Sequence, residues 1–294
     1  MTAHCVAYTL SRLTGLPWIA DFRDPVTSSV ATHDRLTVST QMRWERRVLS
    51  RATYSVFTTP GALRSYAERY PEIDRAGRLR FIPNGYDEDD FEGLPPYRSI
   101  EGEHPLHLVH AGILYPSGRS PIPFFEALAN LRDSGFLGPH DIRVTLRASG
   151  SEALYGAELQ RLGLGSMVTL APTLRYREAL AEQSQADALL LFQGDQYDSQ
   201  IPAKLYEYLR IGRPIFGLVG AHGDTAAILR ESECTALVSL DDVPAIQNGL
   251  MQFIGALRAD RAFCTPRDAA LKYSRHAGAI LLGTLLNQMS GATR

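Results

Sequence analysis

The sequence predicts an α/β protein whose parallel strands are covered by helices on both faces. Short apolar runs alternate along the chain with stretches of helical periodicity. Some of these runs, such as residues 186–193 (ADALLLFQ), are apolar almost throughout, which is typical of strands buried on both faces of a parallel sheet. We therefore expect doubly wound, Rossmann-like architecture.

Nine segments carry the strand pattern. In chain order they are residues 17–22, 54–59, 79–83, 106–112, 142–150, 167–172, 186–193, 213–220 and 235–240. Residues 87–105 are rich in Asp, Glu, Gly and Pro and show no periodicity, so we predict a linker there and a domain boundary near residue ~100. Three predicted strands precede this boundary and six follow it. The second domain therefore has the strands of a complete doubly wound sheet, whereas the first is incomplete.

The chain starts directly in a predicted helix, residues 3–15 (AHCVAYTLSRLTG). Its apolar positions Val6, Leu10 and Leu13 need an apolar partner, and the short sheet predicted for the first domain supplies only part of one. We expect upstream residues or a partner to cover this face. On its own, the chain is expected to self-associate through the uncovered edge of this sheet.

Bulk composition excludes several classes of function. The 294 residues carry a formal net charge of -2, which gives no sequence-wide basic field for a nucleic acid. Cys5, Cys234 and Cys264 are few and far apart, which fits a reduced compartment, the cytoplasm, and no paired cysteine metal site. No apolar run reaches the roughly 18 to 20 residues of a membrane-spanning helix, and the first ten residues lack the charged start of a signal peptide.

One segment, residues 43–51 (RWERRVLSR), is both basic and aromatic. A helix of this kind can rest on a membrane surface. Trp44 and Val48, four residues apart, form a packing stripe equally well. We favour a surface helix of the first domain, and peripheral membrane contact is the alternative.

Residues 201–216 (IPAKLYEYLRIGRPIF) predict an amphipathic helix that begins at Pro202 and ends at Gly212. A helix N-terminus offers unpaired amides and a partial positive charge, which suit a phosphate. Lys204 adds a full positive charge in the first turn, and Glu207 on the same face can accept hydrogen bonds from hydroxyl groups. The alternative is a solvent-exposed ion pair between these two side chains.

Four motifs, in this order and spacing, resemble those of GT-B glycosyltransferases of the family 4 type. They are WIADFRDP (18–25), FIPNGYDEDDF (81–91), HAGILYPSGRSP (110–121) and IPAKLYEYLRIGRPI (201–215). The resemblance covers nearly the whole chain. It implies residues 1–100 as a partial, acceptor-side Rossmann-like domain and residues 101–265 as a domain that holds a nucleotide diphosphate sugar. It implies residues 266–294, with a helix over 266–290, as a segment that crosses back to the first domain.

The resemblance assigns the helix at 201–216 to the nucleotide. Glu207 matches the second glutamate of the family's E-x7-E motif, which binds the ribose, and Pro202 and Ala203 lead into the helix beside it. The first glutamate of that motif would fall at Ser199, and Asp198 is one residue out of register. The family's usual contact to the sugar ring is therefore absent from this pattern.

The segment HAGILYPSGRSP resembles the family's glycine-rich loop. Gly112 and Gly118 let the backbone approach a ligand at the carboxyl end of the sheet. Arg119 lies near the position of a basic residue for the diphosphate, although the arginine that usually follows the first glycine is Ile113 here. An ordinary exposed arginine is the alternative. Gly150 marks another strand end and is assigned to the base pocket, although turns need glycine as well.

The segment DFRDP ends a predicted strand of the first domain with three charged residues. Asp21, Arg23 or Asp24 could orient an acceptor hydroxyl, and we take Asp24 as the candidate. An internal ion pair between arginine and aspartate that fixes the loop is the alternative explanation of this segment. Asn84 and Gly85 predict a structural turn.

No metal ion is expected in this protein. The acidic run at residues 87–90 lies in the predicted linker and resembles the family's hinge, so we reject it as a metal site. The histidines, among them His4, His110 and His222, show no metal-ligand spacing and receive no role.

The resemblance thus implies a glycosyltransferase that moves a sugar from a UDP- or GDP-sugar to a glycan or lipid-linked acceptor, with retention of configuration. Because the first domain is incomplete, we expect the chain on its own to bind nucleotide with little or no transfer activity. The resemblance places it in bacterial cell-surface polysaccharide synthesis, in the cytoplasm or at the inner face of the membrane. Lys204, Arg119 and helix amides would stabilise the departing diphosphate. Two alternatives remain open: an inactive nucleotide-binding remnant of such an enzyme, and a sugar-nucleotide epimerase of the same architecture.

Overall fold

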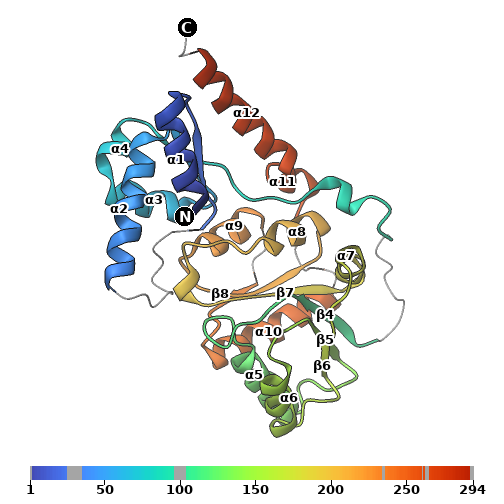
Figure 1. Ribbon diagram of the computed structural model, residues 1–294. Helices are drawn as coiled ribbons and strands as arrows, with labels where there is room; N and C mark the ends of the chain where they lie inside the picture. Colours follow the sequence, from blue (N-terminus) through green and yellow to red (C-terminus); the bar gives the residue numbers. More distant parts are fainter. Residues whose placement is uncertain are drawn as a thin grey trace. The chain divides into compact units, whose positions relative to one another are not determined.

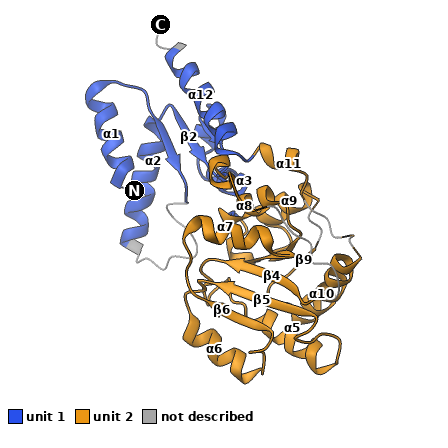
Figure 2. Ribbon diagram, turned by 90° about the vertical axis from the view of Figure 1, so that its right-hand side faces the viewer, with its two compact units in different colours: residues 1–85, 199–201, 273–294 blue, residues 86–198, 202–272 orange. Residues whose placement is uncertain are grey.

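A computed structural model describes residues 2–24, 35–95, 104–233, 236–259, 261 and 265–291. The chain forms two compact units, coloured separately in Figure 2. Unit 1 consists of residues 1–85, 199–201 and 273–294, and unit 2 consists of residues 86–198 and 202–272. Cys234 and Cys264 lie outside the described residues.

Unit 1 contains a three-stranded parallel sheet with the order β1-β2-β3. Its elements in chain order are α1 (Thr2–Thr14), β1 (Ile19–Phe22), α2 (Arg35–Arg51), β2 (Tyr54–Phe57), α3 (Pro60–Arg69), α4 (Pro71–Arg75), β3 (Leu79–Phe81) and α12 (Arg275–Gly291). Each of the three strands predicted for the first part of the chain is present.

The core of unit 1 is built around aromatic rings and one buried carboxylate. The ring of Phe57 lies 5.4 Å from that of Phe22 and 4.6 Å from that of Tyr66. Glu45 of α2 is fully buried and accepts hydrogen bonds from the Tyr66 hydroxyl at 2.7 Å and the Tyr70 hydroxyl at 2.8 Å. Arg69 donates a third at 2.9 Å. These partners offset the desolvation of the carboxylate.

The basic and aromatic segment at 43–51 lies on α2, with one face in the core and one at the surface. Val48 is fully buried, as the predicted packing stripe requires. The Trp44 ring contacts the edge of the Tyr8 ring of α1 at 5.9 Å between centroids. The arginines of this segment remain exposed on the opposite face.

Helix α1 turns its apolar residues away from the core of unit 1. Val6 and Leu10 are each 54% exposed, and Leu13 is 79% exposed. The helix instead packs through Tyr8 and the buried Ser11, whose carbonyl accepts a hydrogen bond from Arg51 at 2.9 Å. Within the described part of the chain, the apolar face predicted from the sequence therefore stays at the surface.

The C-terminal segment predicted as one helix over 266–290 is two helices. Helix α11 (Arg267–Leu271) groups with unit 2, and α12 groups with unit 1. Between them the Ser274 hydroxyl accepts a hydrogen bond from the Ala277 amide at 3.1 Å, which begins α12. A Cβ atom on Gly85 would lie 2.2 Å from the Tyr273 carbonyl oxygen, so only glycine permits the chain to pass this close.

Unit 2 contains a six-stranded sheet of parallel strands in the order β6-β5-β4-β7-β8-β9. Its elements are η1 (Glu88–Phe91), β4 (Leu106–Ala111), α5 (Ile122–Asp133), β5 (Ile142–Arg147), α6 (Glu152–Arg161), β6 (Val168–Ala171), α7 (Tyr176–Gln185), β7 (Ala188–Gln193), η2 (Asp195–Tyr197), α8 (Lys204–Ile211), β8 (Ile215–Val219), α9 (Asp224–Glu231), β9 (Leu237–Val238), α10 (Val243–Arg258) and α11. All six strands predicted for this part of the chain are present.

The strand order of unit 2 reverses direction at β4. The chain first winds from β4 to β5 and β6 on one side, and then returns to the other side of β4 with β7, β8 and β9. Helices α7, α8 and α9 cover one face of the sheet, and α5, α6 and α10 cover the other (Figure 1). Every residue of β7 is buried, which explains its almost continuous apolar sequence. This is the doubly wound, Rossmann-like fold that the sequence predicts.

The division between the units falls after Gly85, whereas the composition predicted a linker over 87–105 and a boundary near residue 100. Residues 86–95 pack on unit 2. Tyr86 and Phe91 are buried with their rings edge to face at 5.6 Å, and Glu88 forms ion pairs with Arg210 and, at 3.3 Å, with Arg267. The 3₁₀ turn is too short to show helical periodicity, so the composition indicated a loop. Residues 96–103 lie outside the described part of the chain.

Candidate nucleotide-binding site

The predicted site residues of unit 2 gather at the carboxyl ends of β4 and β7. These neighbouring strands continue into loops at 112–121 and 194–203, and the chain leaves them in opposite directions. The Gly194 amide donates a hydrogen bond to the Gly118 carbonyl at 2.7 Å, which holds the two loops together. Ligands of doubly wound sheets bind at such a reversal of strand order. The fold therefore offers one preferred place for a ligand in this unit.

Gly112 follows β4 and faces the lysine of α8. Its φ angle is +111°, in the region that favours glycine. A Cβ atom at this position would lie 2.9 Å from the Lys204 Nζ atom. The backbone thus favours glycine here, and a larger residue would displace the end of the lysine side chain.

The other two predicted glycines lie at the same end of the sheet. Gly118 has a φ of +75°, and a Cβ atom there would lie 1.7 Å from the Gln196 Nε2 atom. Gly150, after β5, has a φ of +80°, and its Cβ would lie 3.1 Å from a side-chain carbon of Ile113. The structure therefore brings Gly112, Gly118 and Gly150 together around the loop that follows β4.

Lys204 is the first residue of α8, and its Nζ atom lies 2.9 Å from the His110 Nε2 atom. The pKa of Lys204 is lowered from 10.5 to about 7. Burial is the largest cause, and the positive charge of Arg119 is the second. Glu207 acts in the opposite direction. The amine is therefore poised between its charged and neutral forms near neutral pH.

His110 lies inside the sheet and was given no role from the sequence. Its side chain is 1% exposed, and its Nδ1 atom lies 2.8 Å from the Leu190 carbonyl oxygen of β7. A carbonyl oxygen only accepts hydrogen bonds, so we infer that Nδ1 carries the proton. Burial and the charge of Lys204 hold the pKa of His110 well below 6.5. The ring is therefore neutral, and its Nε2 atom accepts from Lys204.

Arg119 projects between two tyrosine rings. Its guanidinium carbon lies 4.8 Å from the ring centre of Tyr197 and 5.8 Å from that of Tyr115. Within the described part of the chain, its Nε atom is buried without a hydrogen-bond partner. Arg119 is therefore a cation held by aromatic faces with a donor left over, rather than an ordinary exposed arginine.

Glu207 accepts a hydrogen bond from the Tyr176 hydroxyl at 2.8 Å. Tyr176 is the first residue of α7 and is 48% exposed. The alternative predicted from the sequence was a solvent-exposed ion pair between Lys204 and Glu207, without a role in binding. Each of these two side chains instead makes a hydrogen bond to another element of unit 2.

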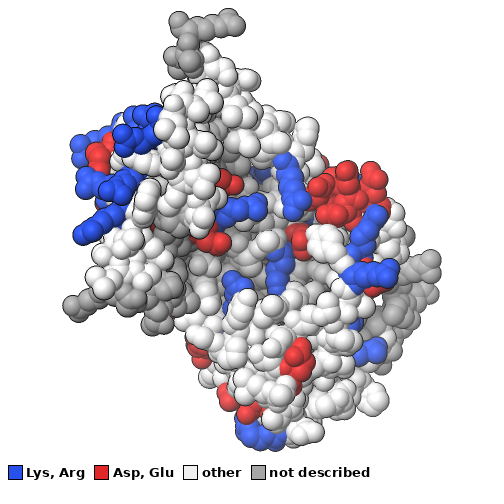
Figure 3. Space-filling view, viewed as in Figure 1, with Lys and Arg blue, Asp and Glu red and all other residues white. Residues whose placement is uncertain are grey.

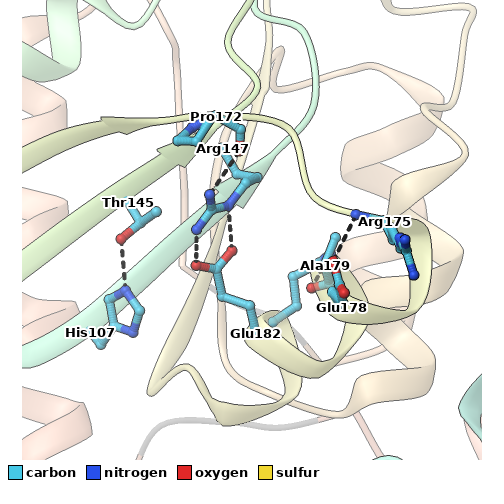
Figure 4. A network of polar contacts seen from close by, with 9 residues as sticks. His107, Thr145, Arg147, Pro172, Arg175, Glu178, Ala179 and Glu182 are labelled. Atoms are coloured by element: carbon cyan, nitrogen blue, oxygen red, sulfur yellow. Dashed lines mark hydrogen bonds and ion pairs between the residues drawn. The ribbon is translucent and has the colours of Figure 1, made fainter.

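A polar network fixes the helix that carries Tyr176 (Figure 4). Arg147, the last residue of β5, donates to Glu182 of α7 at 2.8 Å and to the Pro172 carbonyl at 2.7 Å. At the start of α7 the Arg175 amide donates to the Glu178 carboxylate at 3.1 Å. These contacts tie α7 to the strand ends at which the candidate site lies.

The first turn of α8 differs from its prediction. The helix begins at Lys204, and Pro202 precedes it. The Pro202 carbonyl accepts from the Leu205 amide at 2.9 Å and the Ala203 carbonyl accepts from the Tyr206 amide at 3.1 Å, so a tight turn leads into the helix. The predicted end at Gly212 is confirmed, since this residue has a φ of +72°.

The position at which the family carries its first glutamate belongs to unit 1. Ser199 groups with that unit, and its carbonyl accepts a hydrogen bond from the Thr59 hydroxyl at 2.7 Å. Asp198, one residue earlier, remains in unit 2, where its carbonyl accepts from the Asp224 amide at 2.7 Å. Burial, followed by the charge of Asp195, raises the pKa of the Asp198 carboxyl.

The candidate residues of the DFRDP segment also belong to unit 1. Asp24 is exposed, and the residues that follow it, 25–34, lie outside the described part of the chain. The Arg23 guanidinium lies 3.4 Å from the Asn84 side-chain oxygen, and the Arg23 carbonyl accepts from the Thr58 hydroxyl at 2.9 Å. Asp24 therefore belongs to a different compact unit from Lys204, Arg119 and Glu207.

The acidic run at 87–90 has structural partners. Asp87 accepts a hydrogen bond from the Asp89 amide at 3.3 Å, and Glu88 pairs with arginines. In the ranges that the structure describes, no three His, Cys, Asp or Glu side chains come together in a way that could hold a metal ion. No helix in those ranges is long and apolar enough to cross a membrane.

Sequence reasoning missed four residues that contact the predicted ones. They are His110, Tyr176, Gln196 and Tyr197. His110 could have been found from the sequence, because a histidine inside an otherwise apolar strand is buried and needs a hydrogen-bond partner. Tyr176 lies 31 positions from Glu207 in the chain, and no local pattern joins them.

Comparison with known proteins places this fold among the GT-B glycosyltransferases. No family model and no curated protein matches the sequence. Among solved structures, sucrose-phosphate synthase from Thermosynechococcus elongatus is similar over 98% of this chain and 72% of its own, with a TM-score of 0.72 and 17% identity. The Anabaena protein HepE, described in complex with UDP and glucose, is similar over 97% and 75%, with a TM-score of 0.67 and 14% identity.

A third similar structure is WaaG, described as a glycosyltransferase involved in lipopolysaccharide biosynthesis. The similarity covers 94% of this chain and 80% of that chain, with a TM-score of 0.59 and 16% identity. The chain thus has the α/β GT-B fold.

Proposed function

We propose that this protein is a glycosyltransferase whose unit 2 binds the diphosphate and ribose of a nucleotide sugar. The observation that carries the proposal is the convergence of Lys204 and Arg119 at the reversal of strand order, beside Gly112. Lys204 is held by a neutral histidine, and the Arg119 Nε atom has no hydrogen-bond partner within the described residues. Two cations this close repel each other, and a diphosphate relieves that repulsion.

The same arrangement suits the chemistry of transfer. When the bond between the sugar and the nucleotide breaks, negative charge develops on the diphosphate. Lys204 and Arg119 offer positive charge at fixed positions, and Gly112 and Gly118 allow the backbone to approach the leaving group. Glu207 would accept hydrogen bonds from the ribose. The hydrogen bond from the Tyr176 hydroxyl would keep the Glu207 carboxylate in place. We propose that no metal ion takes part.

The remaining details follow from the resemblance to family 4 enzymes. We propose a UDP- or GDP-linked donor, retention of configuration, and a glycan or lipid-linked acceptor in bacterial cell-surface polysaccharide synthesis. UDP accompanies one similar structure and lipopolysaccharide biosynthesis is named for another, which supports this direction. Asp24 of unit 1 is the candidate to orient the acceptor hydroxyl, and Gly150, Pro202 and Ala203 are candidates to line the nucleotide pocket.

A basic hollow on unit 1 supports peripheral contact with a membrane on the cytoplasmic side. Figure 3 shows positive side chains gathered over α2 and α4. The hollow has a volume of about 500 Å³ and is lined by Tyr8, Arg43, Arg46, Arg47, Ser50 and Arg51. The exposed arginines of α2 beside Tyr8 of α1 suit anionic headgroups. Sedimentation with phosphatidylglycerol vesicles should fall when Arg43 and Arg47 are changed to glutamine, whereas equal sedimentation of the variant would contradict this contact.

The experiment that tests the proposed function separates three reactions of a nucleotide sugar. The chain is incubated with a panel of UDP- and GDP-sugars in EDTA, with and without a glycan or lipid-linked acceptor. Release of UDP or GDP only when the acceptor is present is the expected result. Conversion of the donor without acceptor would identify an epimerase, and binding without consumption would identify a nucleotide-binding protein. Absence of binding to every UDP and GDP compound would contradict the proposal.

A further inference from the structure

His110 is a buried histidine that joins the interior of the sheet to the candidate site. Its Nδ1 atom donates to the Leu190 carbonyl of β7 at 2.8 Å, and its Nε2 atom lies 2.9 Å from the Lys204 Nζ atom. The edge of the ring meets the Phe192 ring, with 5.2 Å between centroids. The ring therefore has a fixed orientation and a fixed tautomer, with one acceptor directed at the amine of Lys204.

We propose that His110 is a positioning residue that holds the Lys204 amine, and that binding of a diphosphate at this amine is coupled to uptake of a proton. The proposal rests on the proposed function, because it takes Lys204 as a phosphate-binding residue. His110 then acts together with Lys204 in binding the diphosphate, and the affinity depends on pH.

The choice of lysine supports this coupling. The sequence contains two lysines, Lys204 and Lys272, and 28 arginines. An arginine stays charged in proteins, whereas a buried lysine can lose its proton. At the one basic position of α8 that touches a buried neutral histidine, the chain therefore has the residue whose charge can change.

The groups around Lys204 determine the direction of the coupling. Burial and the neighbouring charge of Arg119 lower the pKa of Lys204 to about 7, and Glu207 opposes them. His110 is neutral, so it accepts a hydrogen bond from the ammonium group without adding charge. A bound diphosphate favours the ammonium form and raises this pKa. Above pH 7, binding therefore takes up a proton, and affinity falls as the pH rises.

A carboxylate in place of His110 would also hold Lys204, but it would neutralise the charge that a phosphate needs. The neutral ring avoids this competition. A Cβ atom on residue 112 would lie 2.9 Å from Nζ, so glycine at this position leaves room for the amine beside His110.

The test measures the Lys204 titration and UDP binding in the whole chain. With two lysines, a chain labelled with [13C]lysine gives two side-chain resonances, and Lys272→Met identifies which belongs to Lys204. UDP binding is measured by calorimetry between pH 7 and 9, where the phosphates of UDP stay ionised, in buffers of different ionisation enthalpy. We expect uptake of up to about one proton per UDP and an affinity that falls by up to about tenfold per pH unit.

Three substitutions of His110 separate positioning from packing. His110→Gln keeps an acceptor near the place of Nε2, His110→Asn keeps only a donor toward Leu190, and His110→Phe keeps the ring alone. The Phe and Asn variants should titrate Lys204 at lower pH and bind UDP at pH 8 about tenfold more weakly. The Gln variant should recover most of the affinity. Circular dichroism identifies any variant that fails to fold. If His110→Phe fails to fold, the comparison of the Gln and Asn variants tests the positioning role.

Each other outcome overturns the proposal. If the Asn and Gln variants match the wild type in Lys204 titration and UDP affinity, His110 has no positioning role. If Lys204→Met still takes up a proton with UDP, the coupled group is another one. If the wild type binds neither UDP nor GDP at any pH, the proposed function fails and this inference fails with it, so the two failures are distinguishable.

Discussion

The two units differ in how much of their apolar surface they bury. In unit 2, β7 is buried along its whole length, and helices cover both faces of a six-stranded sheet. In unit 1, a three-stranded sheet carries helices whose apolar residues remain exposed, with Leu13 at 79% and Ile280 at 58%. A larger core can hold backbone in unfavourable conformations, such as the non-glycine residue Ala148 at a φ of +54°. The difference teaches that the unit with the more complete core also holds the candidate ligand site.

The units also use buried polar groups differently. Glu45 of unit 1 is buried at 0% exposure among two tyrosine hydroxyls and an arginine, and all three contacts are structural. His110 of unit 2 is buried at 1% and connects to Lys204 at the candidate site. All the contacts of the Glu45 carboxylate lie inside the core of the first unit, whereas His110 joins the interior of the second unit's sheet to the first residue of α8.

The largest expected effect breaks unit 1 and leaves unit 2 intact. Glu45→Ala leaves the Tyr66 and Tyr70 hydroxyls and Arg69 without their acceptor, which should lower the stability of unit 1 by about 3 kcal/mol. Hydrogen exchange should show the loss in α2 and α3. Exchange in β4 and β7, and UDP binding, should stay near wild type. A uniform loss across both sheets would show that the units unfold as one.

The next prediction concerns the backbone of the site. Gly112→Ala places a Cβ atom 2.9 Å from Lys204 Nζ, which displaces the amine, so diphosphate binding should weaken by more than about tenfold. Gly135→Ala is the matched control, because Gly135 also has a positive φ, +73°, and nothing lies within 4 Å of its Cβ position. Both variants should lose about 1 kcal/mol of stability from backbone strain. Equal UDP affinity of the two variants would contradict the role of Gly112.

A smaller effect separates the ribose from the diphosphate. Glu207→Gln should weaken UDP binding by about tenfold, or ~1.4 kcal/mol, because a charged acceptor for the ribose hydroxyls is lost. Inorganic pyrophosphate, which has no ribose, should bind equally well to both proteins. Glu158→Gln on α6 is the control, since its carboxylate pairs with Arg161 on the surface. A parallel loss of pyrophosphate affinity would mean that Glu207 acts through Lys204 instead.

The smallest effect on stability tests the exposed face of α1. Leu13→Glu should change the free energy of unfolding by less than about 0.5 kcal/mol, because this side chain is 79% exposed. Leu49→Ala, at a fully buried position of α2, should cost about 2 to 5 kcal/mol. If the apolar face drives self-association, sedimentation velocity should show less association for Leu13→Glu. A large loss of stability in Leu13→Glu would mean that this face is covered.

Much of this fold could be predicted from the sequence because its strands are continuous apolar runs. The run at 186–193 became β7, and Gly212 ended α8, because hydrophobic period and glycine at positive φ are local signals. The segment at 86–95 was predicted as a linker because the burial of Phe91 and the pairing of Glu88 depend on residues far along the chain.

The residues of the candidate site were likewise predicted only in part. Lys204, Glu207 and the glycines were predicted from local pattern and resemblance, since helix starts and glycine turns have sequence signatures. His110 and Tyr176 were not, because their partners come from other elements, 94 and 31 positions away. Hydrogen bonds between distant elements leave no periodic trace in one sequence.

The measurement that tests the central claim most directly is calorimetry of UDP and GDP binding at pH 7 in EDTA, comparing the wild type with Lys204→Met. Lys272→Met is the control, because this only other lysine of the chain pairs with Glu231 on the surface. We predict that the wild type and Lys272→Met bind one of the two nucleotides without metal. Lys204→Met should lose about 100-fold in affinity, or ~2.7 kcal/mol. Equal binding by all three proteins, or binding that requires added manganese, would contradict the account.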